Sequence, residues 1–400
     1  MEVPVITNAE VQRLRAETRG SSETIHFNNA GTSLPPDIVV ETIVDYIKEE
    51  AVYGGYETEY KYSKELANTY NLIAKLINAG PDEIAIVENA SYAWGVAFNG
   101  IAFKKGDVVI TSEMEYVTNV LGFLNVRKTY GIELKVIAND EHGNFCLQAL
   151  EKAISPQTRL IAITHVPSTA GAVMPVIEIG NIARKHNILY LVDASQSAGQ
   201  IPLDVREIGC DLLVVTGRKY LRAPRGTGFL YVRKQVQDNL KLIFMDGFSA
   251  PTVSQSDFKP REDAKRFELY EKNRALTLGL AKAVEYTLNI GVDRMWQRIQ
   301  FLAGIMREQL KDIDGITVHD TGDLQCGIVT FSVGNIDSFT IKNKLAEKHI
   351  NVSIAKAISA LFYMDKNHLS NIVRASIHCY NTEGEIKIMC DELASIIKGF

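Results

Sequence analysis

The chain has 400 residues, of which 46% are hydrophobic and 23% charged, a balance typical of a globular protein with room for two or three domains. Lys and Arg number 43 against 48 Asp and Glu, so the net charge is −5 and no basic block provides a footprint for nucleic acid. Five scattered cysteines lack CxxC spacing and eight histidines form no ligand-like pair, so neither a disulfide framework nor a zinc site is indicated.

The N-terminal segment MEVPVITNAEVQRLR does not have the continuous apolar core of a signal peptide. No later window approaches the roughly 18 uninterrupted apolar residues of a membrane-spanning helix. We therefore expect a cytoplasmic location without a membrane partner.

Between about residues 80 and 235, short β-branched runs alternate with helical stretches. The runs are GDVVITSE, ELKVIA, RLIAITHV, ILYLVDAS, DLLVVTGR and GTGFLYVR. Strands that are apolar along their whole length are buried on both faces by helices, which predicts an α/β fold with a mainly parallel sheet. Active sites in such sheets lie beyond the carboxyl ends of the strands.

A polar, turn-rich stretch from Asp246, DGFSAPTVSQSDFKPRED, interrupts this pattern. It reads as a lid, a subunit contact or a domain edge. A long helical region follows from about Arg266 to Leu310, and the remaining strand-like and helix-like segments predict a smaller α+β domain. We expect a large domain over 23–275 and a small domain formed by 1–22 and 276–400.

Two polar residues lie at predicted strand ends, Asp193 after ILYLV and Lys219 after DLLVVTGR. Burial can tune a lysine as a nucleophilic amine, although a lone lysine at this position more often reaches out to solvent. Asp193 could pair with a protonated pyridine nitrogen, and alternatively it could cap a helix. Residues 89 to 91, Asn-Ala-Ser, precede a helix whose N-terminus could hold a phosphate or could be simply capped.

The segments VDASQSAGQIPLDV and DLLVVTGRKYLRAPRGTGFLYVR closely resemble the cofactor core of class V aminotransferases. These are fold-type I pyridoxal-5'-phosphate (PLP) enzymes, and matching segments run from FNNAGTSLPP at Phe27 to VRASIHCYNTEGEI ending at Ile386. The resemblance therefore covers nearly the whole chain, and it implies a PLP cofactor and an amino-acid substrate.

The resemblance also implies a role for individual residues. Lys219 would carry PLP as a Schiff base, Asp193 would bind the pyridine nitrogen, and Gln196 would hydrogen-bond the ring O3'. The implied phosphate ligands are Ser91, Thr216, Arg218, where many relatives have histidine, and the backbone of Ala90. Tyr116 matches the ring that stacks on the cofactor, its alternative being a half-buried core tyrosine.

For the substrate, Arg374 matches the arginine that grips the α-carboxylate, for which a planar two-pronged group is suited. A surface salt bridge is the alternative role. Asn29 and Ser168 match positions near the substrate carboxylate or O3', although relatives usually carry asparagine in place of Ser168. The resemblance further implies a homodimer, with Thr252 as a cross-subunit phosphate contact.

PLP labilises any bond at Cα, so the surroundings select the reaction. Desulfurases of the family need a nucleophilic cysteine on a loop before the final arginine, and the segment between Asn351 and Arg374 contains none. The motifs look most like those of hercynylcysteine sulfoxide lyases and related carbon–sulfur lyases. The expected reaction is β-elimination from a cysteine S-conjugate or its sulfoxide, giving pyruvate and ammonia, with Lys219 as general base.

Several alternatives remain from the same family. They are an isopenicillin N epimerase-like enzyme or a decarboxylating or deaminating enzyme of secondary metabolism, an ordinary class V aminotransferase and, least favoured, a cysteine desulfurase. Because one fold hosts all these reactions, the resemblance alone does not choose among them.

Overall fold

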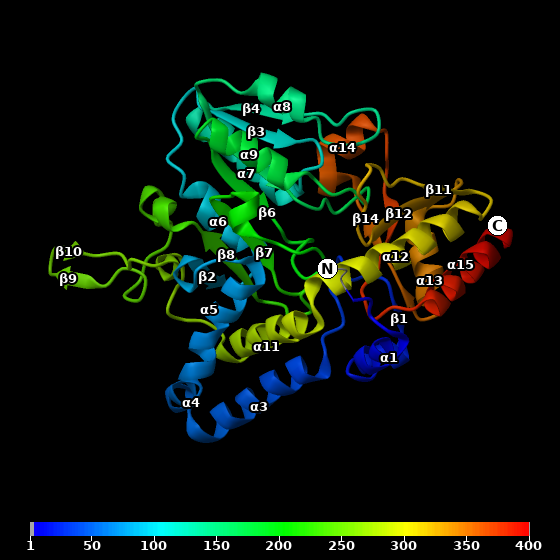
Figure 1. Ribbon diagram of the computed structural model, residues 1–400, viewed down its shortest axis with the longest axis horizontal. Helices are drawn as coiled ribbons and strands as arrows, with labels where there is room; N and C mark the ends of the chain where they lie inside the picture. Colours follow the sequence, from blue (N-terminus) through cyan, green and yellow to red (C-terminus); the bar gives the residue numbers. More distant parts are fainter. Residues whose placement is uncertain (1–3, 400) are drawn as a thin grey trace.

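The computed structural model describes residues 4–399, and a seven-stranded sheet forms the centre of its larger part (Figure 1). In spatial order the strands are β2 (Ile84–Val87), β8 (Gly228–Val232), β7 (Leu212–Thr216), β6 (Leu189–Asp193), β5 (Thr158–Thr164), β3 (Val108–Ser112) and β4 (Glu133–Ile137). The strands from β7 to β4 run parallel, whereas β8 is antiparallel to both β7 and β2. The predicted α/β fold with a mainly parallel sheet is confirmed.

Helices cover both faces of this sheet, which explains why its central strands are apolar along their whole length. Alternate residues of β5 enter opposite cores: Ile161 and Ile163 face one core, Leu160 and Ala162 the other. The first core is completed by α3 (Asp37–Tyr53), α5 (Ser63–Ile77), α8 (Leu147–Ala153), α9 (Val176–Lys185) and α11 (Arg274–Ile290). The second core is completed by α6 (Ala90–Asn99) and α7 (Val117–Tyr130). Two short helices, α4 (Gly55–Lys61) and α10 (Val205–Ile208), lie in connections.

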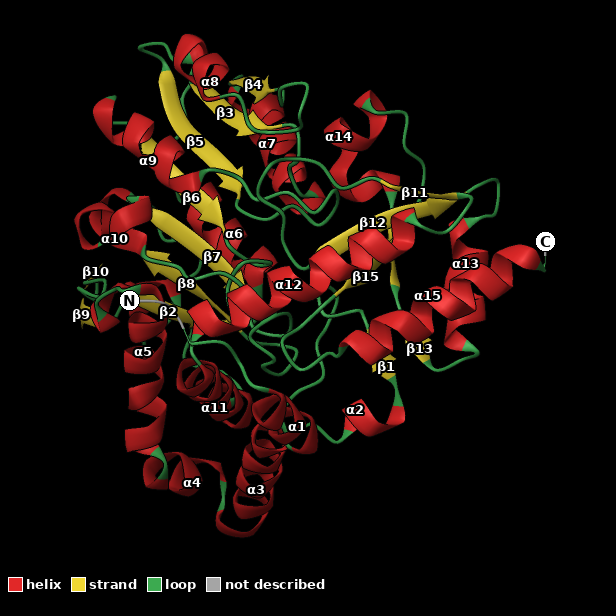
Figure 2. Cartoon of the chain, turned by 45° about the vertical axis from the view of Figure 1, so that its right-hand side comes forward, coloured by secondary structure: helices red, strands yellow, loops and turns green. Residues whose placement is uncertain are grey.

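A second, antiparallel sheet forms the smaller C-terminal part, and Figure 2 shows it as a separate group of strands beside the large sheet. Its order is β11 (Ile316–Val318), β12 (Ile328–Val333), β15 (Ile372–Ser376) and β14 (Ser353–Ala355). Its helices are α12 (Val292–Lys311), α13 (Ser338–Ala346), α14 (Leu361–Lys366) and α15 (Glu383–Lys398). The N-terminal elements α1 (Asn8–Ala16), α2 (Gly20–Glu23) and β1 (Ile25–His26) lie against this part, where β1 pairs with β13 (Ile350–Asn351).

The turn-rich stretch after Asp246 forms a hairpin of β9 (Thr252–Ser254) and β10 (Asp257–Phe258). The hairpin projects from the edge of the protomer, at the far left of Figure 1. All residues of both strands are exposed, including Val253 and Phe258. Exposed apolar side chains on a projection are unfavourable in water, and whether the hairpin is a lid, a subunit contact or a domain edge stays a prediction.

The division of the chain at residue 275 remains a prediction from the sequence. The helix after that boundary, α11, packs on α3 and α5 of the larger part. The next helix, α12, begins directly after Gly291 and belongs to the smaller part. Among residues 4–399, no helix combines the length and the apolar character needed to cross a bilayer.

Candidate active site

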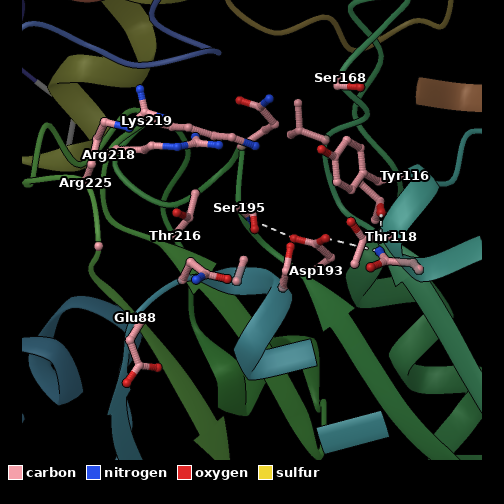
Figure 3. A pocket seen from close by; sticks show the side chains of 18 residues that line it. Glu88, Tyr116, Thr118, Ser168, Asp193, Ser195, Thr216, Arg218, Lys219 and Arg225 are labelled. Carbon is pink, nitrogen blue, oxygen red and sulfur yellow. Dashed lines mark hydrogen bonds between the residues drawn. The ribbon is translucent and has the colours of Figure 1, made fainter. Parts of the chain in front are cut away.

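A cavity of about 290 Å³ opens beyond the carboxyl ends of β5, β6 and β7 (Figure 3). Its position is the one that the parallel sheet predicts. Nine predicted site residues line this one cavity: Ala90, Ser91, Tyr116, Ser168, Asp193, Gln196, Thr216, Arg218 and Lys219. Its lining also includes nine residues that the sequence analysis did not single out as ligands: Glu88, Asn89, Thr118, Asn119, Thr164, Val166, Ser195, Arg225 and Gly226.

Asp193 is the last residue of β6, and two hydrogen bonds hold its carboxylate. Oδ1 accepts from the backbone N–H of Ser195 at 2.9 Å, and Oδ2 accepts from Asn119 Nδ2 at 3.1 Å (Figure 3). Only 5% of the residue is exposed. A carboxylate with fixed orientation inside the cavity is suited to pair with a cationic ring nitrogen.

Lys219 follows β7, the neighbour of β6, in a tightly packed turn. A Cβ at Gly217 would lie 2.4 Å from Thr227 Oγ1 and 2.9 Å from Ala223, so only glycine fits there. The N–H of Gly217 donates to Thr227 O at 2.8 Å, and Arg218 O accepts from the N–H of Ser33 at 2.9 Å. These contacts direct the lysine toward the cavity.

The surroundings of Lys219 favour its neutral amine. Burial, together with the charges of Arg218 and Arg374, lowers the pKa of Lys219 to about 7, although Asp193 opposes the shift. Its Nζ lies 5.9 Å from the centroid of the Tyr116 ring. A neutral amine at physiological pH is the form that attacks an aldehyde and the form that accepts a proton.

The N-terminus of α6 forms one end of the cavity. Asn89 caps the helix by accepting a hydrogen bond from the N–H of Tyr92 at 2.9 Å. The first-turn N–H groups of Ala90 and Ser91 have no partner within the helix and attract anions. Arg218 stands at the same end, where its Nη1 donates to Gly31 O at 2.8 Å. Burial and the nearby Arg225 lower the pKa of Arg218, so an anion there would be stabilised.

Buried polar atoms without a protein partner mark the rest of the cavity. Within residues 4–399, Gln196 Oε1 and Ser195 Oγ are buried and make no hydrogen bond. Gln196 Nε2 donates to Ala30 O at 3.0 Å and has a second hydrogen to donate. Since unpaired buried polar atoms are costly, these groups are suited to contact a polar ligand.

Arg374 lies on β15 of the smaller part and contacts a residue of the cavity lining in the larger part. It does not line the cavity, but its Nη1 donates to the carbonyl of Ser168, which does, at 3.2 Å. Its Nε is buried without a partner among the described residues, and burial lowers the pKa of its guanidinium. No carboxylate lies within ion-pair distance of it in the described structure, so a carboxylate ligand would be favoured.

The other two predicted residues lie outside the cavity lining. The side chain of Asn29 is fully buried and engaged: it donates to Ser376 O at 2.8 Å and His26 O at 3.1 Å, and accepts from Tyr380 at 2.6 Å. These bonds link the N-terminal segment to β15. Thr252 is exposed in the β9–β10 hairpin, and its predicted contact with a phosphate across a subunit interface stays a prediction.

Asn119 and Thr164 are the most consequential residues that sequence reasoning missed. Both contact the carboxylate of Glu115, and Asn119 also contacts Asp193. The signal for them was weak: Asn119 follows Glu115 by four residues at the start of a helix, a spacing that ordinary capping also produces.

Comparison with known proteins places the chain in a family. The model of the family described as "Aminotransferase class-V" matches residues 25–389. The chain belongs to the class-V aminotransferase family. A probable cysteine desulfurase from Methanothermobacter thermautotrophicus is 31% identical over 379 residues, covering 93% of this chain and 94% of that protein. The apo cysteine desulfurase of Thermococcus onnurineus NA1 superposes with a TM-score of 0.92 at 27% identity, covering 100% and 99% of the two chains.

A structure of the cystine C–S lyase C-DES, solved with its product cysteine persulfide, has a TM-score of 0.86 at 22% identity, covering 94% of this chain and 99% of that one. This likeness concerns the fold alone. The relatives from Methanothermobacter thermautotrophicus and Thermococcus onnurineus are named as desulfurases, so they support the expected family but not the expected likeness to sulfoxide lyases.

The class-V site fits PLP by the chemistry of its donors. The nucleophilic lysine, the carboxylate and the anion-binding helix end lie around one cavity, as an aldehyde, a pyridine nitrogen and a phosphate require. Gln196 and Ser195, which carry the unpaired Oε1 and Oγ atoms, line the same cavity. The protein is therefore a PLP-dependent class-V enzyme.

Proposed function

We propose that this enzyme cleaves the carbon–sulfur bond of a cysteine-derived amino acid by β-elimination, releasing pyruvate and ammonia. Among the described residues that line the cavity there is no cysteine, and this observation carries the proposal. A desulfurase that passes sulfur to its own thiol needs that thiol within reach of the substrate.

The environments of the cysteines support elimination. Cys379, which lies closest in sequence to Arg374, is fully buried, with its Sγ 3.3 Å from His378 Nδ1. Burial raises the pKa of Cys379 to about 11 and that of Cys326 to about 12. Thiols of this kind are protonated at neutral pH and are poor nucleophiles. Cys210 and Cys390 are buried as well, and Cys146 is partly exposed beside α8.

Each residue has a distinct task in the proposed reaction. Arg374 would hold the substrate carboxylate and Asp193 would hold the ring nitrogen of bound PLP, and together they would orient Cα toward Lys219. PLP, when bound, supplies an electron sink for negative charge at Cα. Lys219 takes the Cα proton, the Cβ–S bond breaks, and the sulfur leaves with the electron pair. Hydrolysis of the remaining enamine gives pyruvate and ammonia.

Desulfuration is the second candidate function, and the named relatives favour it. The two reactions differ in their products. Desulfuration of L-cysteine leaves alanine and a persulfide, whereas elimination leaves pyruvate, ammonia and a free sulfur leaving group.

The test is to incubate the PLP-loaded enzyme with L-cysteine, L-cystine, a cysteine thioether and its sulfoxide, and to measure pyruvate, ammonia, alanine and protein persulfide together. We expect pyruvate and ammonia in equal amounts, and faster turnover for better sulfur leaving groups.

A variant with all five cysteines replaced, shown to fold and to bind PLP, should retain elimination. Alanine with persulfide on one cysteine, and loss of activity in the variant, would establish the desulfurase instead. Transfer of the amino group to an oxo acid, or racemised substrate, would indicate a transaminase or an epimerase.

A further inference from the structure

Glu115 is a fully buried carboxylate that lies behind the wall of the cavity rather than in its lining. It precedes α7, next to Tyr116. Burial without a cationic partner is costly for a carboxylate, so its retention here calls for a physical reason.

Hydrogen-bond donors surround both of its oxygens. Oε1 accepts from the N–H of Tyr116 at 2.9 Å, from Asn119 Nδ2 at 2.7 Å and from Thr164 Oγ1. Oε2 accepts from Thr111 Oγ1 at 3.0 Å and from the N–H of Thr164 at 3.2 Å. An ionised carboxylate is acceptor-only and can take about four such bonds, so this donor set matches the charged form. Burial and the nearby charge of Asp193 raise the pKa of Glu115, and the bonds from Thr164, Asn119 and Tyr116 offset that rise only in part.

Asn119 connects this buried charge to the cavity. Its Nδ2 donates to Glu115 Oε1 at 2.7 Å and to Asp193 Oδ2 at 3.1 Å, and lies 3.3 Å from Thr164 Oγ1. An amide nitrogen has two hydrogens. With one on each carboxylate, the amide cannot rotate without losing both bonds. The orientation of Asp193 thus depends on Glu115.

We propose that Glu115 is a positioning residue, which acts through Asn119 to orient Asp193 and adds a second negative charge behind the carboxylate that faces the cofactor ring. The inference rests on the proposed cofactor site at Lys219 but not on the type of reaction. A second negative charge in a medium of low dielectric favours protonation of the ring nitrogen and of the lysine-bound cofactor. The other groups that act on Lys219 are Arg218, Arg374 and the Tyr116 ring.

The main test is Glu115→Gln, which removes the charge and keeps the shape. The readouts are the pH midpoint of the visible absorption of the lysine-bound cofactor and the Kd of PLP by equilibrium dialysis. Loss of negative charge destabilises the protonated form, so the midpoint should move to lower pH by about half a unit or more, and the Kd should rise about threefold or more. A purely structural role would lower thermal stability without moving the midpoint.

Glu113→Gln is the matched control. Glu113 is buried on the same segment, but its carboxylate binds Lys366 at 2.8 Å rather than Asn119. Its replacement should leave the midpoint unchanged. Asn119→Ala should shift the midpoint in the same direction as Glu115→Gln. The double variant should shift it by less than the sum of the two single changes, because the two residues share the path through Asn119.

An unchanged midpoint in Glu115→Gln overturns the inference. If that variant does not fold, Asn119→Ala decides alone, since it leaves the other four bonds of Glu115 in place, and an unchanged midpoint there overturns the inference equally. A parent protein that shows no visible band with PLP overturns the proposed cofactor site and this inference together. A parent protein that shows the visible band, together with variants whose midpoint is unchanged, overturns this inference only.

Discussion

Lys219 lines the cavity, and Arg374 hydrogen-bonds to Ser168, which lines it too. Both are basic side chains, and the charge of Arg374 helps to lower the pKa of Lys219. Two like charges held near each other raise the free energy of the empty site. The neutral form of Lys219 and an anion beside Arg374 both relieve that cost. The chemistry at these residues therefore follows from their shared environment.

The lowered pKa of Lys219 predicts how the apoenzyme takes up PLP. Only the neutral amine attacks the aldehyde, and the neutral fraction rises until the pH exceeds the folded-state pKa of about 7. The rate of reconstitution, followed by stopped-flow absorbance, should rise about tenfold per pH unit below pH 7 and level off above about pH 8. A rate that continues to rise in proportion beyond pH 9 would contradict the lowered pKa.

Arg374→Lys should raise KM for amino-acid substrates, because a point charge replaces a two-pronged contact. A charged hydrogen bond contributes about 1.5–3 kcal/mol, which corresponds to about 10- to 150-fold in KM. The control is Arg298→Lys, since Arg298 is half-buried and donates to Cys379 O and Asn381 O, outside the cavity lining. Equal KM values for the two variants would move the carboxylate site elsewhere.

At the scale of elements, the carboxyl ends of β6 and β7 and the N-terminus of α6 meet around one cavity. The parallel pairing of β6 and β7 places Asp193 and the turn that carries Lys219 at the same sheet edge. The antiparallel pairs of β8 with β7 and β2 bring Gly228 beside both Thr216 and Val87, so the start of α6 lies next to the end of β7. The order of the strands thus assembles the end of the cavity that is predicted to hold the phosphate.

Asn89→Ala tests the start of α6. Loss of the cap should cost about 1 kcal/mol of unfolding free energy, measured by urea denaturation. It should also weaken PLP binding, because the first-turn N–H groups lose their fixed direction. Asn273→Ala removes an equivalent cap from α11, where Asn273 accepts from the N–H of Leu276 at 2.9 Å. The control variant should lose a similar amount of stability and keep its PLP affinity. Weaker PLP binding in both variants would indicate that the loss of affinity follows from the loss of stability alone.

At the scale of the whole molecule, the β9–β10 hairpin extends away from the protomer and carries Thr252 with it. The expected homodimer would place this hairpin over the cavity of the partner. Apolar Val253 and Phe258 are 61% and 47% exposed, which is unfavourable for a projection that stays in water.

Mixed dimers test this arrangement. Thr252→Val should weaken PLP binding in its homodimer by removing a hydroxyl from the phosphate, and Lys219→Ala should not form the lysine-bound cofactor. In a mixed dimer of the two, one site has Lys219 from the first subunit and Thr252 from the second. We expect that site to regain the parent PLP affinity, measured by equilibrium dialysis of a doubly tagged heterodimer. An affinity that stays at the level of the Thr252→Val homodimer would place the contact within one chain or nowhere.

Much of the site could be predicted from the sequence because its residues follow strands of strong pattern. The runs that end at Asp193 and before Lys219 are apolar throughout, so strand type and a common sheet edge followed from periodicity and parallel order. The resemblance to class V members then assigned Ser91, Thr216 and Gln196 to the same cavity, where the structure places them. Arg374, on β15 of the other domain, also came from that resemblance, because no local pattern distinguishes it.

Tertiary structure alone decided the rest. The bond from Asn119 to Asp193 joins residues 74 positions apart, and the amide of Asn29 is committed to a backbone carbonyl 347 positions away. A hydrogen bond forms only where the donor–acceptor distance is right to within a few tenths of an ångström, and a sequence pattern carries no such information. The sequence by itself therefore determined which residue types stand at the strand ends, since periodicity and residue chemistry are local properties, and its resemblance to class V members indicated the cofactor class. The fold determined which charges are buried and which polar atoms lack partners, because burial and pairing arise only when distant segments pack together.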